Sequence, residues 1–416
     1  MINKLRLDAG ASMVGGSDVT IKATKKADWA RYAPWIVGGW FVVLMLYVDA
    51  AGTENGVIRH TELWGRDFIN VWTGGKLIAA GDFATLYTST AFSAFQEAIF
   101  GPLDPHVYSY PPTAFPIASF FSLLPYPFAL AIWLVGTTGL FVWAARSWWP
   151  AGGGPFWLAA LTPAALVNLW IGNYGFMIGA IFLLAFRRLD DRPVMAGAII
   201  GLFAMKPQLA VLIPLVLLIR RDWRVIYSAA VSTAGFIAAS GVIYGWVAWE
   251  AFLTRATGKQ VSVIDAHGAF FGKMSTSAAT AVLDLGGGWT VALAAQAVLA
   301  ALGIVLVAVA AWRRVRTDQL ALLLATCTFL VLPYAINYDL VVVCIGAWVV
   351  MIDRANAPVD RVLASIGFVA PQMGIVFAMF GAPVTPLMLA GLAIAQFRVA
   401  VIGRAAPEAA AAVRSA

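Results

Sequence analysis

The chain has 416 residues, of which 61% are hydrophobic and only 12% are charged, and its mean hydropathy is +0.82. Soluble domains carry about 25% charged residues, so this composition excludes an ordinary water-soluble fold. The net charge of +7 would suggest a nucleic-acid partner in a soluble protein, but here the basic residues fall in short segments between apolar runs. That distribution is typical of the cytoplasmic turns of a membrane protein.

Apolar runs long enough to cross a bilayer recur from Tyr32 to Phe397. They predict an all-α polytopic integral membrane protein with about 12 transmembrane helices (roughly 11–13) by the rule of some 20 residues per span. We expect a disordered cytoplasmic tail at residues 1–28, the membrane domain at 29–402 and a second cytoplasmic tail at 403–416.

The basic residues also predict the orientation. Basic residues precede the first span, near Tyr32–Val48, so the N-terminus is expected in the cytoplasm. Later basic clusters mark further inner turns, at 187–192, 220–224, 313–316, 354–361 and 398–404. The alternation predicts a multi-pass protein of the cytoplasmic membrane with both termini inside. The loops at 51–126 and 246–288 then face outward.

The first outer loop contains the longest polar interval between apolar segments. Apolar residues at helical spacing predict an amphipathic helix over Asp67–Ala80 that lies on the bilayer, and Thr90–Phe100 resembles a second interfacial helix. The segment Thr113–Leu124 is short for a span, so we expect it to be re-entrant or interfacial. The runs Val194–Met205 and Leu209–Ile219 are also short, which suggests half-length or tilted helices.

Asp67 is the first candidate for a catalytic group. An isolated carboxylate at the membrane–water boundary can accept a proton beside a lipid-borne substrate. The alternative is that Asp67 only caps the following helix, where an acid is favourable by roughly 0.3–1 kcal/mol. The residue alone favours the cap.

Lys206 is the second candidate. The tripeptide Lys206-Pro207-Gln208 separates two short apolar runs, and Pro207 can begin the second of them as a helix. Lys206 is a lone cation at a predicted outer turn, where an anionic phosphate head group would lie. A lysine that snorkels to the surface is the alternative.

Two polar tripeptides open later helices, Gly172-Asn173-Tyr174 and Asn337-Tyr338-Asp339. A helix cap is the simplest interpretation of each. In the second outer loop, Asp265 and His267 could place a titrating imidazole beside a carboxylate, although a solvated loop is the default.

No cluster of His, Cys or acidic residues has metal-ligand spacing. The two cysteines, Cys327 and Cys344, both lie in apolar segments and predict neither a disulfide nor a metal site.

Together these motifs resemble glycosyltransferase family 87, also called the DUF2029 family. The matching residues are, in chain order, Asp67-Phe68 with Trp72 and Gly75, Gly81-Asp82 with Leu86-Tyr87, Tyr110-Pro111-Pro112, Leu124-Pro125-Tyr126, Ala131, Trp133, Lys206-Pro207-Gln208-Leu209, Arg220-Arg221-Asp222-Trp223-Arg224 and Tyr338-Asp339-Leu340. Where the family commonly has Gly-Gln, this chain has Gly172-Asn173.

The resemblance implies a GT-C fold and an activity like that of the polyprenol-phosphate-mannose-dependent mannosyltransferases. A sugar, mannose or another hexose, would move from a polyprenyl-phosphate donor to a lipid or glycan acceptor on the outer face of the membrane, without a cofactor. Asp67 would be the general base of one inverting step. Lys206 would hold the donor phosphate, with Lys273, His267 and Arg66 as further candidates. The substrate-binding candidates are Asp82, Tyr87, Tyr110, Asn173, Gln208, Tyr338 and Asp339.

Two other classes of function compete with this interpretation. A transporter or lipid flippase without transferase chemistry would want charges or broken helices near mid-membrane, whereas the ionisable residues here are predicted at the outer boundary. A structural membrane subunit would leave the acid- and aromatic-rich first loop unexplained. The expected partners are the lipid-linked donor, the acceptor and membrane lipids, with no nucleic acid; the sequence predicts no oligomeric state.

Overall fold

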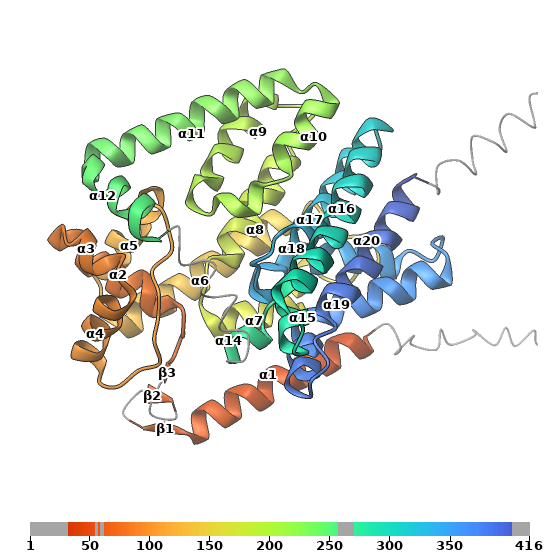
Figure 1. Ribbon diagram of the computed structural model, residues 1–416. Helices are drawn as coiled ribbons and strands as arrows, with labels where there is room; N and C mark the ends of the chain where they lie inside the picture. Colours follow the sequence, from red (N-terminus) through yellow and green to blue (C-terminus); the bar gives the residue numbers. More distant parts are fainter. Residues whose placement is uncertain (1–31, 55–56, 59–61, 257–269, 402–416) are drawn as a thin grey trace, which may run out of the picture.

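The computed structural model describes residues 32–54, 57–58, 62–256 and 270–401, and about three quarters of the structure is helical (Figure 1). The first part of the chain forms α1 (Ala33–Ala51), α2 (Phe68–Ala80), α3 (Phe83–Leu86), α4 (Ser89–Phe100), η2 (Pro112–Ala114), α5 (Phe115–Ser122), α6 (Tyr126–Ala145), η3 (Phe156–Leu161), α7 (Pro163–Ile171) and α8 (Gly175–Phe186). The middle forms α9 (Pro193–Ile200), η4 (Gly201–Met205), η5 (Pro207–Ala210), α10 (Ile213–Arg220), α11 (Trp223–Tyr244), α12 (Trp246–Ala251) and the π turn η6 (Phe252–Ala256). The last part forms α14 (Phe270–Lys273), α15 (Ala278–Asp284), α16 (Trp289–Trp312), α17 (Thr317–Val331), η7 (Asn337–Asp339), α18 (Val341–Ile352), α19 (Pro358–Met379) and α20 (Thr385–Val401).

Four helices in the described residues are both long and apolar enough to cross a membrane: α6, α11, α16 and α19. Each has 20 to 24 residues, so each extends about 30 Å or more. Seven shorter apolar helical segments accompany them. The helical membrane architecture expected from the sequence is therefore plausible, while the count of about 12 spans stays a prediction.

The helices α8 and α18 lie at the centre of the packing. In each, ten of the twelve residues are buried. A helix that is apolar on all sides is expected in such a position, because no face of it prefers water. Each of the two begins just after a polar segment, at Asn173 and at Asp339 respectively.

The sequence prediction of short helices around Lys206 is confirmed. The α9–η4 segment and the η5–α10 segment meet at Lys206, and the turns nearest to it are 3₁₀ turns. Lys206 itself is only 6% exposed. The tip of this hairpin is thus enclosed by other helices, while its position at the outer side of the membrane stays a prediction.

The first outer loop differs from its prediction in two ways. A small antiparallel sheet, β1 (Thr53–Glu54), β2 (Val57–Ile58) and β3 (Glu62–Leu63), lies in a protein expected to be all-α. Helix α2 forms where it was expected, but ten of its thirteen residues are buried. It therefore lacks the exposed polar face that was expected of an amphipathic surface helix. Its Gly75 packs directly on the backbone of Ala118 in the short helix α5, which is too short to span a bilayer.

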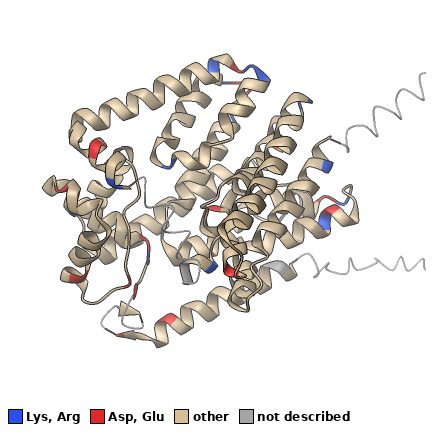
Figure 2. Cartoon of the chain, in the orientation of Figure 1, with Lys and Arg blue, Asp and Glu red and all other residues tan. Residues whose placement is uncertain are grey.

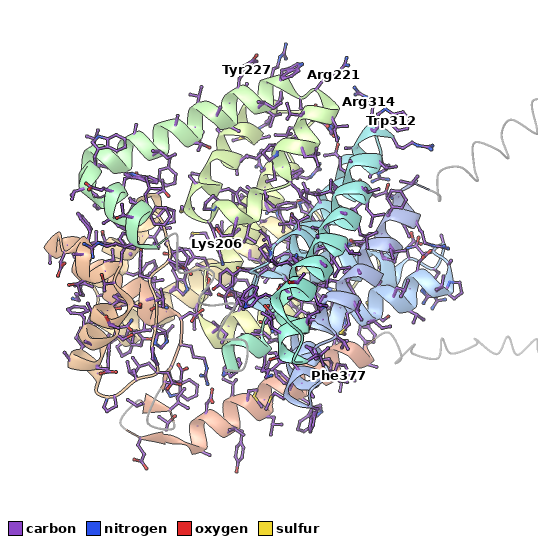
Figure 3. All side chains as sticks on the ribbon, in the orientation of Figure 1. Lys206, Arg221, Tyr227, Trp312, Arg314 and Phe377 are labelled. Atoms are coloured by element: carbon purple, nitrogen blue, oxygen red, sulfur yellow. The ribbon has the colours of Figure 1, made fainter. Side chains whose placement is uncertain are left out.

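The charges are distributed unevenly over the molecule. Lys and Arg gather at the helix ends at the top and right of Figure 2. Figure 3 labels Arg221 and Arg314 at this end, together with the exposed aromatic residues Tyr227 and Trp312, while Phe377 lies at the opposite end. Helix α1 begins and α20 ends on the right of Figure 1. This arrangement agrees with the alternation of basic turns in the sequence.

Candidate active site

Two loops that are far apart in the sequence meet at Asp67. The Nδ2 group of Asn173 donates a hydrogen bond of 2.7 Å to Oδ2 of Asp67, and the backbone N–H of Asp67 donates to the carbonyl of Ile171 at 2.9 Å. Asp67 occupies the N-cap position of α2, yet its side chain accepts no hydrogen bond from the helix. Asp67 thus forms no capping hydrogen bond, because its carboxylate is directed to Asn173 instead.

Gly172 permits this close approach. It has a φ of +75°, and a Cβ at this position would lie 2.6 Å from the carbonyl oxygen of Gly65. Any side chain would therefore both strain the backbone and push the loop that carries Asp67 away. The carbonyl of Gly172 also accepts a hydrogen bond of 2.9 Å from the buried Trp133 indole, which fixes the turn.

Lys206 forms a buried ion pair with Asp339. Its Nζ lies 2.8 Å from Oδ1 and 2.6 Å from Oδ2 of Asp339, and the two side chains are only 7% and 5% exposed. The ammonium also lies 5.2 Å from the ring centre of Tyr338. Lys206 thus neither snorkels to the surface nor lacks a partner.

Asn173 connects these two charged groups. Its Oδ1 accepts hydrogen bonds from the backbone N–H of Tyr174 at 2.6 Å, from the Tyr110 hydroxyl at 3.2 Å and from Lys206 Nζ at 3.4 Å. Because Nδ2 of the same amide donates to Asp67, one side chain joins the Asp67 carboxylate to the Lys206 ammonium. We call Asp67, Asn173, Lys206 and Asp339 the polar cluster.

Tyr87 and Tyr110, the two tyrosines of the first loop that were predicted to bind substrate, have different roles in this arrangement. Tyr110 contacts the polar cluster directly, and its ring lies 4.5 Å from that of Tyr174. Tyr87 is 1% exposed, and its hydroxyl donates to the backbone carbonyl of Tyr110 at 2.7 Å. Tyr87 therefore positions Tyr110 and does not itself reach the cluster.

The segment that carries Asp339 is held from two sides. The Nδ2 group of Asn337 donates to the carbonyl of Pro371 at 2.5 Å, and the Asn337 N–H donates to Met274 at 3.1 Å. Gly175 at the start of α8 packs directly on the carbonyl of Tyr338. The N-cap of α18 is Leu340, so the prediction that Asn337 or Asp339 caps this helix is wrong.

Burial sets the proton affinities of the two acids. Burial raises the pKa of Asp67 and outweighs the opposing effects of the Asn173 hydrogen bond, of the neighbouring His106 and Lys206, and of the Tyr338 hydrogen bond. Burial likewise raises the pKa of Asp339 against the attraction of Lys206. Asp67 is consequently a stronger base than an ordinary aspartate.

Three helices begin at the polar cluster: α2 at Asp67, α8 just after Asn173 and α18 just after Asp339. The N-terminal end of a helix carries a partial positive charge and unpaired N–H groups. The cluster is therefore a region in which an anion is favourable, even though it already holds two carboxylates and one ammonium.

Other predicted site residues have different surroundings. Arg66 forms an ion pair with Asp49 at 2.9 Å, lies 3.7 Å from Glu62 and stacks over Trp170 at 4.4 Å. Lys273 is paired with Asp284 at 2.8 Å. Both predicted phosphate-binding cations are thus engaged by carboxylates in the structure.

Asp82 and Gln208 do not join the polar cluster. Asp82 is exposed and caps α3 by accepting a hydrogen bond of 3.0 Å from the N–H of Thr85. The whole of α2, about 20 Å long, separates it from Asp67. Gln208 is half-buried, and its side chain forms no hydrogen bond with a residue in the described ranges. His267 lies outside the described residues.

Sequence reasoning missed the partners of Arg66. Asp49 is 5% exposed, and its Oδ2 accepts hydrogen bonds from both Arg66 and the Trp170 indole, the latter at 2.6 Å. Asp49 stands alone at the end of the first apolar run, and an acid in such a position is itself a signal of a buried partner. His106, 4.0 Å from Glu62, is a second residue that the sequence analysis did not single out.

An apolar groove adjoins Lys206. It has a volume of about 510 Å³ and is lined by residues of η4, η5, α10 and α11, among them Phe203, Pro207 and Ile226. Pro207 follows Lys206 directly in the chain, so one end of the groove lies near the backbone of Lys206, although no residue of the polar cluster lines the groove.

Comparison with known proteins identifies one family. The family model described as Glycosyltransferase family 87 matches residues 108–333, which is more than half of the chain. No curated protein and no solved structure matches the chain. The matched range, 108–333, includes Asn173 and Lys206, while Asp67 lies well before it and Asp339 a few residues after it.

Proposed function

The chain belongs to glycosyltransferase family 87 and is a glycosyltransferase, and from this premise we propose that it moves a hexose, such as mannose, from a polyprenyl-phosphate donor to a lipid or glycan acceptor. The reaction would take place at the outer face of the cytoplasmic membrane. The observation that carries the proposal is the buried link Asp67–Asn173–Lys206, which joins a base to a cation through one amide.

Asp67 is the general base in this proposal. It takes the proton of the acceptor hydroxyl as the hydroxyl oxygen attacks the anomeric carbon of the donor sugar, and the bond from that carbon to the phosphate oxygen breaks. The step inverts the configuration at the anomeric carbon. Its raised pKa supports the role, because a carboxylate that binds a proton more tightly is a better acceptor.

Lys206 stabilises the departing lipid phosphate. An ammonium group has three N–H donors, and Asp339 occupies the short contacts at 2.6 and 2.8 Å. The contact to Asn173 is long at 3.4 Å, so this donor can turn to a phosphate oxygen with little loss. Asp339 then orients the ammonium, and the helix ends of α8 and α18 add to its effect.

The apolar groove beside Pro207 is an argument for a donor that carries a prenyl chain. A phosphate held at Lys206 would allow its lipid to lie against Phe203, Ile226 and their neighbours. An apolar groove that adjoins a buried cation suits a ligand with an anionic head and a hydrocarbon tail. The donor is bound by protein residues alone in this proposal, with no cofactor.

A transporter or lipid flippase would also have buried charges between helices, as Lys206 and Asp339 are. Membership of a glycosyltransferase family favours an enzyme over a transporter without catalytic activity. The direct test is to incubate the purified protein with polyprenyl-phosphate mannose and a lipid extract. The proposal expects release of polyprenyl phosphate together with a new glycolipid. Donor binding without either product would contradict it.

A further inference from the structure

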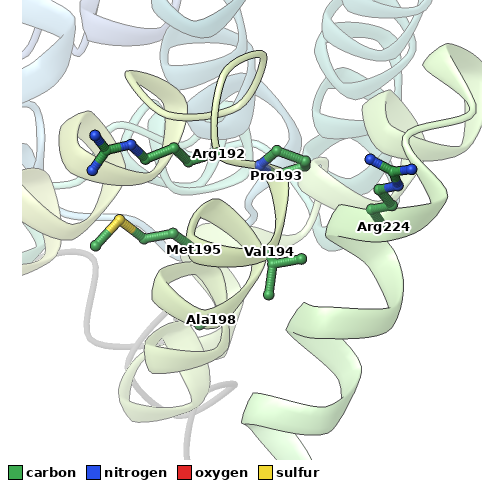
Figure 4. Close-up of a pocket in the computed structure, with 6 residues that line it drawn as sticks. All are labelled: Arg192, Pro193, Val194, Met195, Ala198 and Arg224. Atoms are coloured by element: carbon green, nitrogen blue, oxygen red, sulfur yellow. The ribbon is translucent and has the colours of Figure 1, made fainter.

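A second hollow lies far from the polar cluster, between the start of α9 and the start of α11. It has a volume of about 600 Å³ and is lined by Arg192, Pro193, Val194, Met195, Ala198 and Arg224. Figure 4 shows the two arginines on either side of Pro193 and Val194. The wall of the hollow is apolar, and the charged groups stand at its rim.

The two helices that form the hollow are firmly joined. The Ser228 hydroxyl donates to the carbonyl of Val194 at 2.6 Å, and the Ser232 hydroxyl donates to that of Ala198 at 2.8 Å. Gly197 packs directly on the backbone of Val225. The hollow is therefore a fixed feature of the α9–α11 packing and does not depend on the position of a loose loop.

The charge of the hollow is not neutralised within the described part of the chain. Of the neighbouring acids, Asp190 and Asp222 are both engaged by Arg220, each at 2.7 Å, while Asp191 is exposed to solvent. No carboxylate among the described residues pairs with Arg192 or Arg224. Helix α11 also begins here, and its N-terminal end adds a partial positive charge. The rim of the hollow is thus basic on both sides and favours an anionic ligand.

The surroundings show at what depth this anion would lie. Trp223 and Tyr227, in the first two turns of α11, are 50% and 67% exposed, and exposed aromatic residues of this kind mark the membrane–water boundary. Val194 and Met195 are also exposed, beside the apolar outer surface of α11. The rim of the hollow would face the head groups and its wall the acyl chains.

We propose that this hollow binds an anionic glycerophospholipid, with its head group against the basic rim that Arg192 and Arg224 form and an acyl chain along Val194 and Met195. Basic pockets between helices at the cytoplasmic side of membrane proteins bind lipid head groups in this way. A soluble anion such as inorganic phosphate would use the two arginines but would leave the apolar wall without a partner. The lipid accounts for both features.

The test compares two variants that lose the same charge. Arg192→Gln/Arg224→Gln removes the proposed site. Arg187→Gln/Arg221→Gln removes two exposed arginines from the same end of the molecule that do not line the hollow. Each protein is purified into phosphatidylcholine nanodiscs and titrated with phosphatidylglycerol, and bound lipid is counted by native mass spectrometry. Equal melting temperatures in phosphatidylcholine alone confirm that both variants fold.

We expect the site variant to bind phosphatidylglycerol roughly thirtyfold more weakly than the wild type, and the control variant to stay close to the wild type. Equal loss in both variants would mean that only the general basic charge attracts the lipid and would overturn the site. Unchanged binding in the site variant would overturn it as well. Displacement of the lipid by millimolar inorganic phosphate would assign the two arginines to a soluble anion instead.

Discussion

The Nδ2 group of Asn173 donates a hydrogen bond of 2.7 Å to Oδ2 of Asp67 across 106 positions of sequence. This contact ties Asp67, outside the range that matches the family model, to the turn before α8, inside that range. It also orients the carboxylate of Asp67 toward the Lys206–Asp339 pair. The account of the site depends on this contact more than on any other.

Substitution of Asn173 should show that its amide orients and tunes Asp67. The variant Asn173→Asp has nearly the same shape, but it replaces the donor by a second carboxylate facing Asp67. Like charges raise the pKa of a carboxylate, so the acid limb of the pH–rate profile should move to higher pH and the rate near neutrality should fall. Asn173→Gln retains the amide and should keep more activity than Asn173→Asp. Identical pH–rate profiles for the wild type and Asn173→Asp would show that Asn173 does not act on Asp67.

The pH dependence of the wild-type rate follows from the raised pKa of Asp67. A general base works only when it is deprotonated, so the rate must rise with pH through the pKa of Asp67. Because burial raises that pKa above its ordinary value of 3.8, the acid limb should lie at a higher pH than for a solvent-exposed aspartate. Measurement of the turnover rate across the acidic range at saturating donor checks this. A rate that stays constant down to pH 4 would be inconsistent with a raised pKa.

Lys206 should act on turnover more than on donor binding. Loss of the charge in Lys206→Met removes stabilisation of the leaving phosphate, for which we expect a fall of roughly 10²–10³-fold in rate. Lys206→Arg should retain part of the activity, since the charge remains while its geometry changes. Steady-state kinetics with varied lipid donor separate the two effects. An unchanged rate in Lys206→Met would mean that another group holds the phosphate.

The variant Lys206→Met should also be less stable than the wild type, because it leaves Asp339 buried without its partner in the Lys206–Asp339 pair. Such a loss costs about 3–5 kcal/mol of stability. The double variant Lys206→Met/Asp339→Asn should recover much of the melting temperature, since no unpaired charge remains, but it should stay slow. Recovery of the rate together with the stability would show that the pair has a structural role only.

Gly172 should be intolerant of a side chain. In Gly172→Ala, the new Cβ would lie 2.6 Å from the Gly65 carbonyl and the backbone would keep its φ of +75°. We expect a loss of roughly 1–3 kcal/mol and a lower melting temperature in detergent. Gly139 in α6 is the matched control, because a Cβ there meets no atom within 4 Å. Gly139→Ala should leave the melting temperature unchanged or slightly higher, and an equal effect of both substitutions would contradict the argument.

The sequence predicted the helical elements better than their environments. Spacing of apolar residues located α2 and the short helices around Lys206, because periodicity depends on local geometry. It did not show that α2 is buried on nearly all sides, since burial depends on which elements pack against it. The two-residue strands near Thr53 have no pattern long enough to detect.

The residues of the candidate site could be predicted from their types, but the residues with which they interact could not. Asp67, Asn173, Lys206 and Asp339 were all singled out, and the structure brings them together. Their pairing was not visible, because ion pairs between residues 133 positions apart leave no local signature. For the same reason Arg66 and Lys273 were expected as free cations, whereas the structure pairs them with Asp49 and Asp284.

The central claim is that Asp67 is the proton acceptor, and Asp67→Asn tests it most directly. Asn keeps the size of the side chain, so the fold and the binding of the donor should persist. The measurement is the single-turnover rate of polyprenyl-phosphate release by the purified variant, with donor binding determined in parallel. We predict a rate lower by roughly 10²–10⁴-fold with donor affinity close to that of the wild type. A rate within a factor of a few of the wild type would contradict the account.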